Sequence, residues 1–93
     1  MKAESVKKYY GFAKKAGAII IGTDKIVASA NVYLIFASDS LAQNAVDRLA
    51  RKADKSNCIL QMFTKDEFEL IEPNQNIKAI GIKNKELAKA MQK

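Results

Sequence analysis

Residues 32–37 read VYLIFA, an uninterrupted apolar run in which β-branched and aromatic residues predominate. A strand that is apolar at every position has no polar face to turn toward water, so other elements must cover both of its sides. The run therefore predicts a central strand of a sheet with helices on both faces.

Segments with helical spacing alternate with short apolar runs on either side of this strand. The helical spacing predicts helices over 4–16, from Thr23 or Asp24 onward, from Leu41 to about Ala53, from the capping-box sequence TKDE at 64–67 through Leu70, and after a cap at Asn84. The other apolar runs predict strands at 18–21, 58–63 and 77–82. This alternation predicts a three-layer α/β/α sandwich with a mixed, largely parallel four-stranded sheet.

Composition narrows the classes of function. We expect the 93 residues to form one domain, and their formal net charge of +6 favours a polyanionic partner. The lone Cys58 cannot form an internal disulfide, and without histidine no thiolate–imidazole pair is possible. The lone cysteine suits a reducing cytoplasm. We expect a non-catalytic protein without cofactor or metal, and a monomer by default. No apolar run approaches the roughly 20 residues that span a bilayer, so no membrane partner is expected.

The sequence GAIIIGTDKIVASAN at 17–31 takes a short strand directly into a helix. The first backbone N–H groups of a helix are unpaired and carry partial positive charge, which suits a phosphate group. Gly22 would let a ligand approach the backbone, and Thr23, Asp24 and Lys25 add a hydroxyl, a carboxylate and an ammonium group. The alternative is that Gly22 only forms a tight turn and Thr23 or Asp24 caps the helix.

Two groups of basic residues are open to more than one interpretation. Those of the first helix would follow a phosphate backbone or simply form a solvated face: Lys7, Lys8, Lys14 and Lys15. Those of the third helix alternate with Asp47 and Asp54, which favours a solvated face: Arg48, Arg51, Lys52 and Lys55.

Aromatic side chains can stack on unpaired bases, but most of those in this chain have the spacing of core residues. We expect packing roles for Tyr9, Tyr10, Phe12, Phe63 and Phe68, and a core position for Tyr33 in the central strand.

The order FAKKAGAIIIGTDKIVASA, VYLIFASDS, CILQMFTKDEFELI and IKAIGIKN along the chain resembles the ribosomal protein family of the L-seven-Ae type, which binds kink-turn RNA. The chain is most similar to the small bacterial YlxQ-like branch, over nearly its whole length. The resemblance implies an α/β/α protein that grips a sharply bent RNA through the loop and helix start at Gly22, Thr23, Asp24 and Lys25. It implies a second contact from the loop around 73–77, which includes Asn74 and Asn76, and places Ser38 and Asp39 near the same edge.

The chain departs from the better-known RNA-binding members at several of these positions. Asp24-Lys25 stands where they have Asn-Glu, so Lys25 reverses the charge of the base-reading residue and favours the RNA backbone. Apolar residues also replace their lysines, at Ala18, Ile20, Ile21 and Ala28.

These observations favour a non-catalytic RNA-binding protein of translation, associated with the ribosome, with Lys14 and Lys15 adding phosphate contacts. The alternative is a protein–protein adaptor on the same fold without RNA binding. A small enzyme using Asp24 or Asp39 is disfavoured, since the sequence has no histidine, paired carboxylates or phosphate-binding glycine loop. A membrane-surface role for the first helix is disfavoured because its apolar side is needed for the core.

Overall fold

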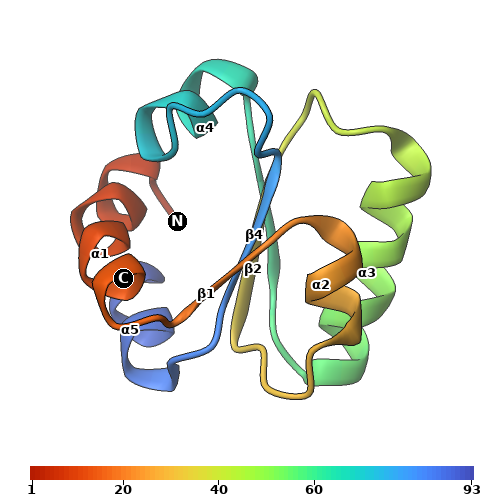
Figure 1. Ribbon diagram of the computed structural model, residues 1–93, viewed down its shortest axis with the longest axis horizontal. Coiled ribbons are helices and arrows are strands. Elements are labelled where there is room, and N and C mark those ends of the chain that lie inside the picture. The colour runs from red at the N-terminus through yellow and green to blue at the C-terminus, as the bar shows by residue number, and fades with distance from the viewer.

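The computed structural model describes residues 1–93, in which five helices alternate with four strands (Figure 1). The helices are α1 Ala3–Lys15, α2 Thr23–Ala28, α3 Gln43–Ser56, α4 Lys65–Ile71 and α5 Lys85–Met91. The strands are β1 Ile19–Ile21, β2 Leu34–Ser38, β3 Leu60–Phe63 and β4 Ala79–Ile82. The predicted order of elements is confirmed, with ends that differ by up to three residues. None of the helices has the length and apolar composition needed to cross a bilayer.

The strands form one mixed sheet in the order β1-β4-β2-β3. Strand β4 pairs antiparallel with both β1 and β2, and only β2 and β3 are parallel. The prediction of a largely parallel sheet is therefore wrong. Helix α4 and the loop after it return the chain to the end of the sheet where β3 finished. Strand β4 therefore starts from that end and runs antiparallel to its neighbours.

Strand β2 is covered on both faces, as its sequence predicts. Helices α1, α4 and α5 cover one face of the sheet, and α2 and α3 cover the other (Figure 1). Leu34 and Phe36 belong to the core on the first face, and Ile35 and Ala37 belong to the core on the second. Gly81 of β4 allows the close approach of α2, because a Cβ atom there would lie 3.3 Å from Ile26 Cγ1.

Aromatic rings organise the first core around Phe36. Its ring centroid lies 6.2 Å from that of Tyr10, 6.2 Å from that of Phe63 and 5.9 Å from that of Phe68. The packing roles expected for these residues are confirmed. The core position expected for Tyr33 is wrong: it precedes β2, which begins at Leu34, and its side chain is 37% exposed.

Three helix ends follow their local sequence signals. Gly17 follows α1 with a φ of 66°, a left-handed conformation that glycine adopts without strain. Thr64 and Glu67 form the expected capping box of α4, and Asn84 Oδ1 accepts a hydrogen bond from Leu87 N at the start of α5. Helix α3 begins at Gln43, two residues after the expected Leu41.

Candidate functional site

One end of the sheet gathers three of the segments expected to contact RNA. Strands β1, β2 and β3 run in the same direction, so their C-terminal ends meet where β4 begins. Gly22 N donates to Ala79 O at 3.0 Å, and Ser38 N donates to Lys78 O at 2.9 Å. The starts of α2 and β4 and the end of β2 therefore lie side by side.

Gly22 shapes the start of α2. It is the residue that precedes the helix, with φ 96° and ψ 146°, and no side chain accepts a hydrogen bond from the first turn. The alternative in which Thr23 or Asp24 caps the helix is therefore wrong. The space beside Gly22 is open, because a Cβ atom at this position would have no neighbouring atom within 4 Å. The conformation demands glycine, and the open side leaves the backbone accessible.

Asp24 is held by an ion pair with α3. Arg48 Nη1 donates to Asp24 Oδ1 at 2.8 Å, although the Asp24 side chain is 88% exposed. This pair joins the start of α2 to the neighbouring helix across their shared surface. Lys25, the next residue, is exposed and makes no ion pair.

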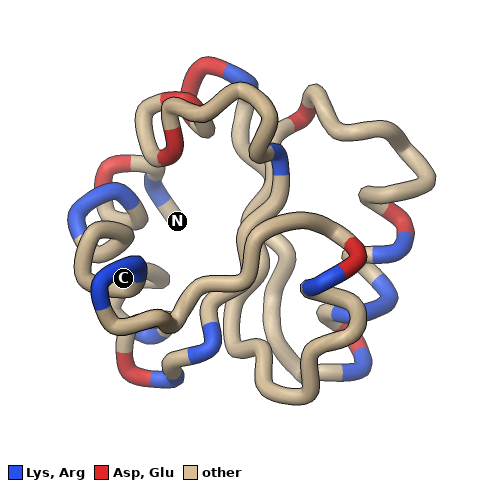
Figure 2. Tube along the Cα trace, viewed as in Figure 1, with Lys and Arg blue, Asp and Glu red and all other residues tan.

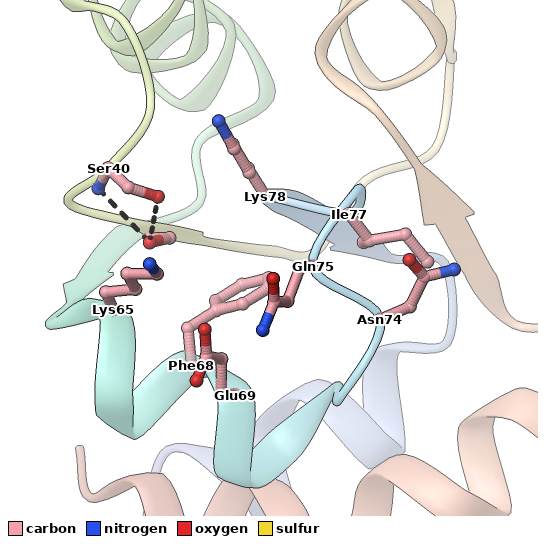
Figure 3. A pocket seen from close by; sticks show the side chains of 9 residues that line it. Ser40, Lys65, Phe68, Glu69, Asn74, Gln75, Ile77 and Lys78 are labelled. Atoms are coloured by element: carbon pink, nitrogen blue, oxygen red, sulfur yellow. Dashed lines mark hydrogen bonds between the residues drawn. The ribbon is translucent and has the colours of Figure 1, made fainter.

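A cavity of about 210 Å³ lies at the same end of the sheet, between the end of β2, α4 and the loop that leads to β4 (Figure 3). Phe68, Glu69 and Gln75 lie close together in it, whereas Lys78 extends away from them. Its lining is mostly polar: Ser38, Ser40, Lys65, Phe68, Glu69, Asn74, Gln75, Ile77 and Lys78. The cavity offers donors and acceptors on both sides and an aromatic ring between them.

Ser38 and Asp39 lie at this end as expected, and both make structural hydrogen bonds. Ser38 is buried and its Oγ lies 2.7 Å from Ser40 Oγ, close enough for a hydrogen bond. Asp39 Oδ1 accepts from Lys65 N at 3.0 Å, at the first turn of α4. These two residues therefore shape the edge of the cavity.

The loop after α4 is anchored by a buried carboxylate that sequence reasoning missed. Glu72 Oε1 accepts from the Tyr10 hydroxyl at 2.7 Å and lies 3.5 Å from Lys14 Nζ, while Glu72 Oε2 accepts from Asn74 N at 3.0 Å. Burial raises the pKa of the Glu72 carboxyl, but these donors outweigh it and leave the pKa below its usual value. A glutamate followed by Pro73 is a common sequence of exposed turns, so nothing in the sequence indicates that this carboxylate is buried.

Asn74 and Asn76 shape the loop itself. Asn74 Oδ1 accepts from Asn76 N at 3.0 Å, which closes a tight turn. Asn74 lines the cavity, whereas Asn76 is exposed outside it.

The structure separates Lys14 from Lys15. Lys14 reaches Glu72 and so borders the loop, with 55% of its side chain exposed. Lys15 lines a different hollow of about 210 Å³ on the outer side of α1, with Lys7, Lys8, Gly11 and Phe12. Phe12 is 65% exposed, so the packing role expected for it is wrong. Its position on the outer side of α1 points it away from the sheet.

The basic residues of α3 line a groove of about 270 Å³ against α2, together with Val27: they are Arg48, Arg51, Lys52 and Lys55. Figure 2 shows Lys and Arg positions along α3, next to acidic and basic positions near the start of α2, which packs against α3. Lys52 Nζ donates to Ser29 O across the groove. The spacing of these cations along the sequence favoured a solvated face. The packing of α2 beside them could not be inferred from that spacing.

No family model and no curated protein matches the chain. Among solved structures, it is similar to a protein of unknown function from Bacillus halodurans C, with a TM-score of 0.75 and 17% sequence identity over 99% of this chain and 100% of that chain. A likeness at this identity shows that the two chains share their fold.

Proposed function

We propose that this chain is an α/β/α sandwich that acts as a non-catalytic RNA-binding protein, associated with the ribosome, and docks structured, kink-turn-like RNA at the end of the sheet where α2 begins. Lys25 and Lys14 supply ammonium groups on two sides of the site. The backbone at Gly22 and Thr23 and the loop around 73–77 approach the RNA between them.

The observation that carries the proposal is the convergence of the start of α2, the end of β2 and the loop before β4 at one end of the sheet. Convergent loops on a rigid sheet are a common way to position binding residues. The net charge of +6 supports a polyanionic ligand, and the polar cavity beside Phe68 suits a base that leaves the RNA stack.

The proposal is tested with a fluorescently labelled RNA hairpin that carries a bulge followed by tandem G·A pairs, as in a kink-turn. This hairpin is the sharply bent RNA of the experiment. Fluorescence anisotropy gives its Kd, and a continuous duplex of the same length measures binding without the bend. We expect tighter binding to the bent RNA. Lys25→Glu should weaken this binding about tenfold, because a charge-assisted contact is replaced by repulsion.

Lys85→Glu is the matched control, since Lys85 lies in the first turn of α5 at the opposite end of the sheet. It makes the same charge change and should leave the Kd nearly unchanged. Equal binding of bent and continuous RNA, or equal losses in the two variants, would overturn the proposed site. No RNA binding by the wild type would leave the protein–protein adaptor as the better explanation.

Co-sedimentation with ribosomal particles, lost at high salt, tests the association with the ribosome.

A further inference from the structure

The groove between α2 and α3 has a lining whose only charges are positive. Four cationic side chains face it, and the remaining lining residue is Val27. We propose that this groove binds the phosphodiester backbone of an RNA strand that continues from the docking site at the end of the sheet. This second surface rests on the proposed RNA-binding function and extends it.

The charges of α3 are segregated by sign around the helix. At 3.6 residues per turn, the four cations fall within an arc of about 100°, because they occupy positions i, i+3, i+4 and i+7. Asp47 and Asp54 fall outside that arc and do not line the groove. Gln43 Nε2 donates to Asp47 Oδ1 at 2.9 Å, away from the cations. A face that served only solubility would not need to exclude its carboxylates from one groove.

Both arginines of the chain, Arg48 and Arg51, lie in this groove. The guanidinium group binds phosphate through two parallel hydrogen bonds, and its weak hydration lowers the cost of contact. Fourteen lysines are spread over the rest of the chain and the groove. The residue type best suited to phosphate is therefore confined to one place.

Most of the groove's charge is free of acidic partners. The structure contains two ion pairs, and only Arg48 of the groove takes part in one, with Asp24. Lys52 is bound to the neutral Ser29 carbonyl, which fixes its direction without cancelling its charge. Arg51 and Lys55 are exposed and make no ion pair.

The groove also has the position and length that a strand needs. The Asp24–Arg48 pair joins it to the start of α2, so it is continuous with the proposed docking site. From Arg48 to Lys55 the helix rises about 10 Å at 1.5 Å per residue. A groove of this length can contact successive phosphates of one strand and is not limited to a single phosphate.

The test compares the bent RNA hairpin in complex with wild type and with Arg51→Gln/Lys55→Gln, using Kd values from about 50 to about 300 mM KCl. Each lost phosphate contact should reduce the steepness of log K against log salt by about 0.7 to 0.9. Lys83→Gln/Lys85→Gln, at the opposite end of the sheet, removes the same charge and should leave the slope unchanged. Thermal unfolding followed by circular dichroism confirms that each variant is folded.

Arg51→Lys separates charge from geometry. It keeps the positive charge but lacks the two-pronged donor, so affinity should fall severalfold while the salt slope stays the same. Because the chain has only two arginines, their side-chain Nε–Hε signals in NMR spectra report on the groove directly. Both signals should shift when the RNA is added.

Unchanged affinity and slope in Arg51→Gln/Lys55→Gln, or arginine signals that do not move, would overturn this inference. If the same RNA still loses affinity for Lys25→Glu, the proposed function stands and only the groove is wrong. If the wild type binds no RNA, both proposals fail together.

Discussion

The Glu72 carboxylate is buried against α1, with its Oε1 atom 2.7 Å from the hydroxyl oxygen of Tyr10. The two residues lie 62 positions apart in the sequence. Their contact fixes the beginning of the loop that lines the cavity. Asn74 N donates a second hydrogen bond to this carboxylate, at the Oε2 atom. Burial and the neighbouring carboxylate both raise the pKa of the Tyr10 hydroxyl, which therefore stays protonated as a donor.

Tyr10→Phe should lower the free energy of unfolding by about 1.5 to 3 kcal/mol, because it leaves a buried carboxylate without one of its donors. Urea denaturation measures the change. Tyr9→Phe, on the half-buried neighbour, is the matched control and should have little effect. A loss below about 0.5 kcal/mol for Tyr10→Phe would contradict the role assigned to this hydrogen bond.

The lowered pKa of Glu72 predicts how stability depends on pH. The folded pKa is below that of the unfolded chain, about 4.3, so this group stabilises the fold above that pH. The contribution is lost as the pH falls through the folded pKa. Wild type should lose more free energy of unfolding than Glu72→Gln between about pH 5 and pH 3. Parallel acid profiles for the two proteins would contradict this.

Gly22→Ala should destabilise the fold by about 1 kcal/mol or more, because an L side chain is strained at a φ of 96°. Gly11→Ala is the matched control. Gly11 lies inside α1 with open space around it, so alanine should raise stability by about 0.5 to 1 kcal/mol through its better helix propensity. Denaturant unfolding measures both changes. Equal effects of the same sign would show that the backbone at Gly22 is not strained by alanine.

Asp24→Asn should strengthen RNA binding severalfold, since it removes a negative charge beside the groove and frees Arg48 for phosphate. The exposed ion pair contributes little to folding, so stability should change by less than about 1 kcal/mol. Asp47→Asn makes the same charge change on α3 outside the groove and should strengthen binding less. Weaker binding by Asp24→Asn would instead indicate that the carboxylate itself accepts hydrogen bonds from a base.

The candidate site was predictable in part. The start of α2 and the glycine before it are visible in the local pattern at Gly22, because turn chemistry is a property of neighbouring residues. The exposure of Phe12 was not predictable in the same way. A helix shows which residues share a side, but packing decides how wide the buried stripe is, and α1 buries a stripe that leaves Phe12 outside.

Local patterns in the chain were enough to specify the kinds of element, their order and several of their ends, since helical periodicity, strand-forming runs and capping residues act over a few positions. They also specified the positive charge and the apolar core of the central strand. The packing of the folded chain was needed to show that β4 runs antiparallel between β1 and β2, that Glu72 is buried against Tyr10, and that α2 closes a groove over the cations of α3. These features depend on which surfaces pack together across long distances in the sequence. Short-range patterns along a chain do not determine that packing.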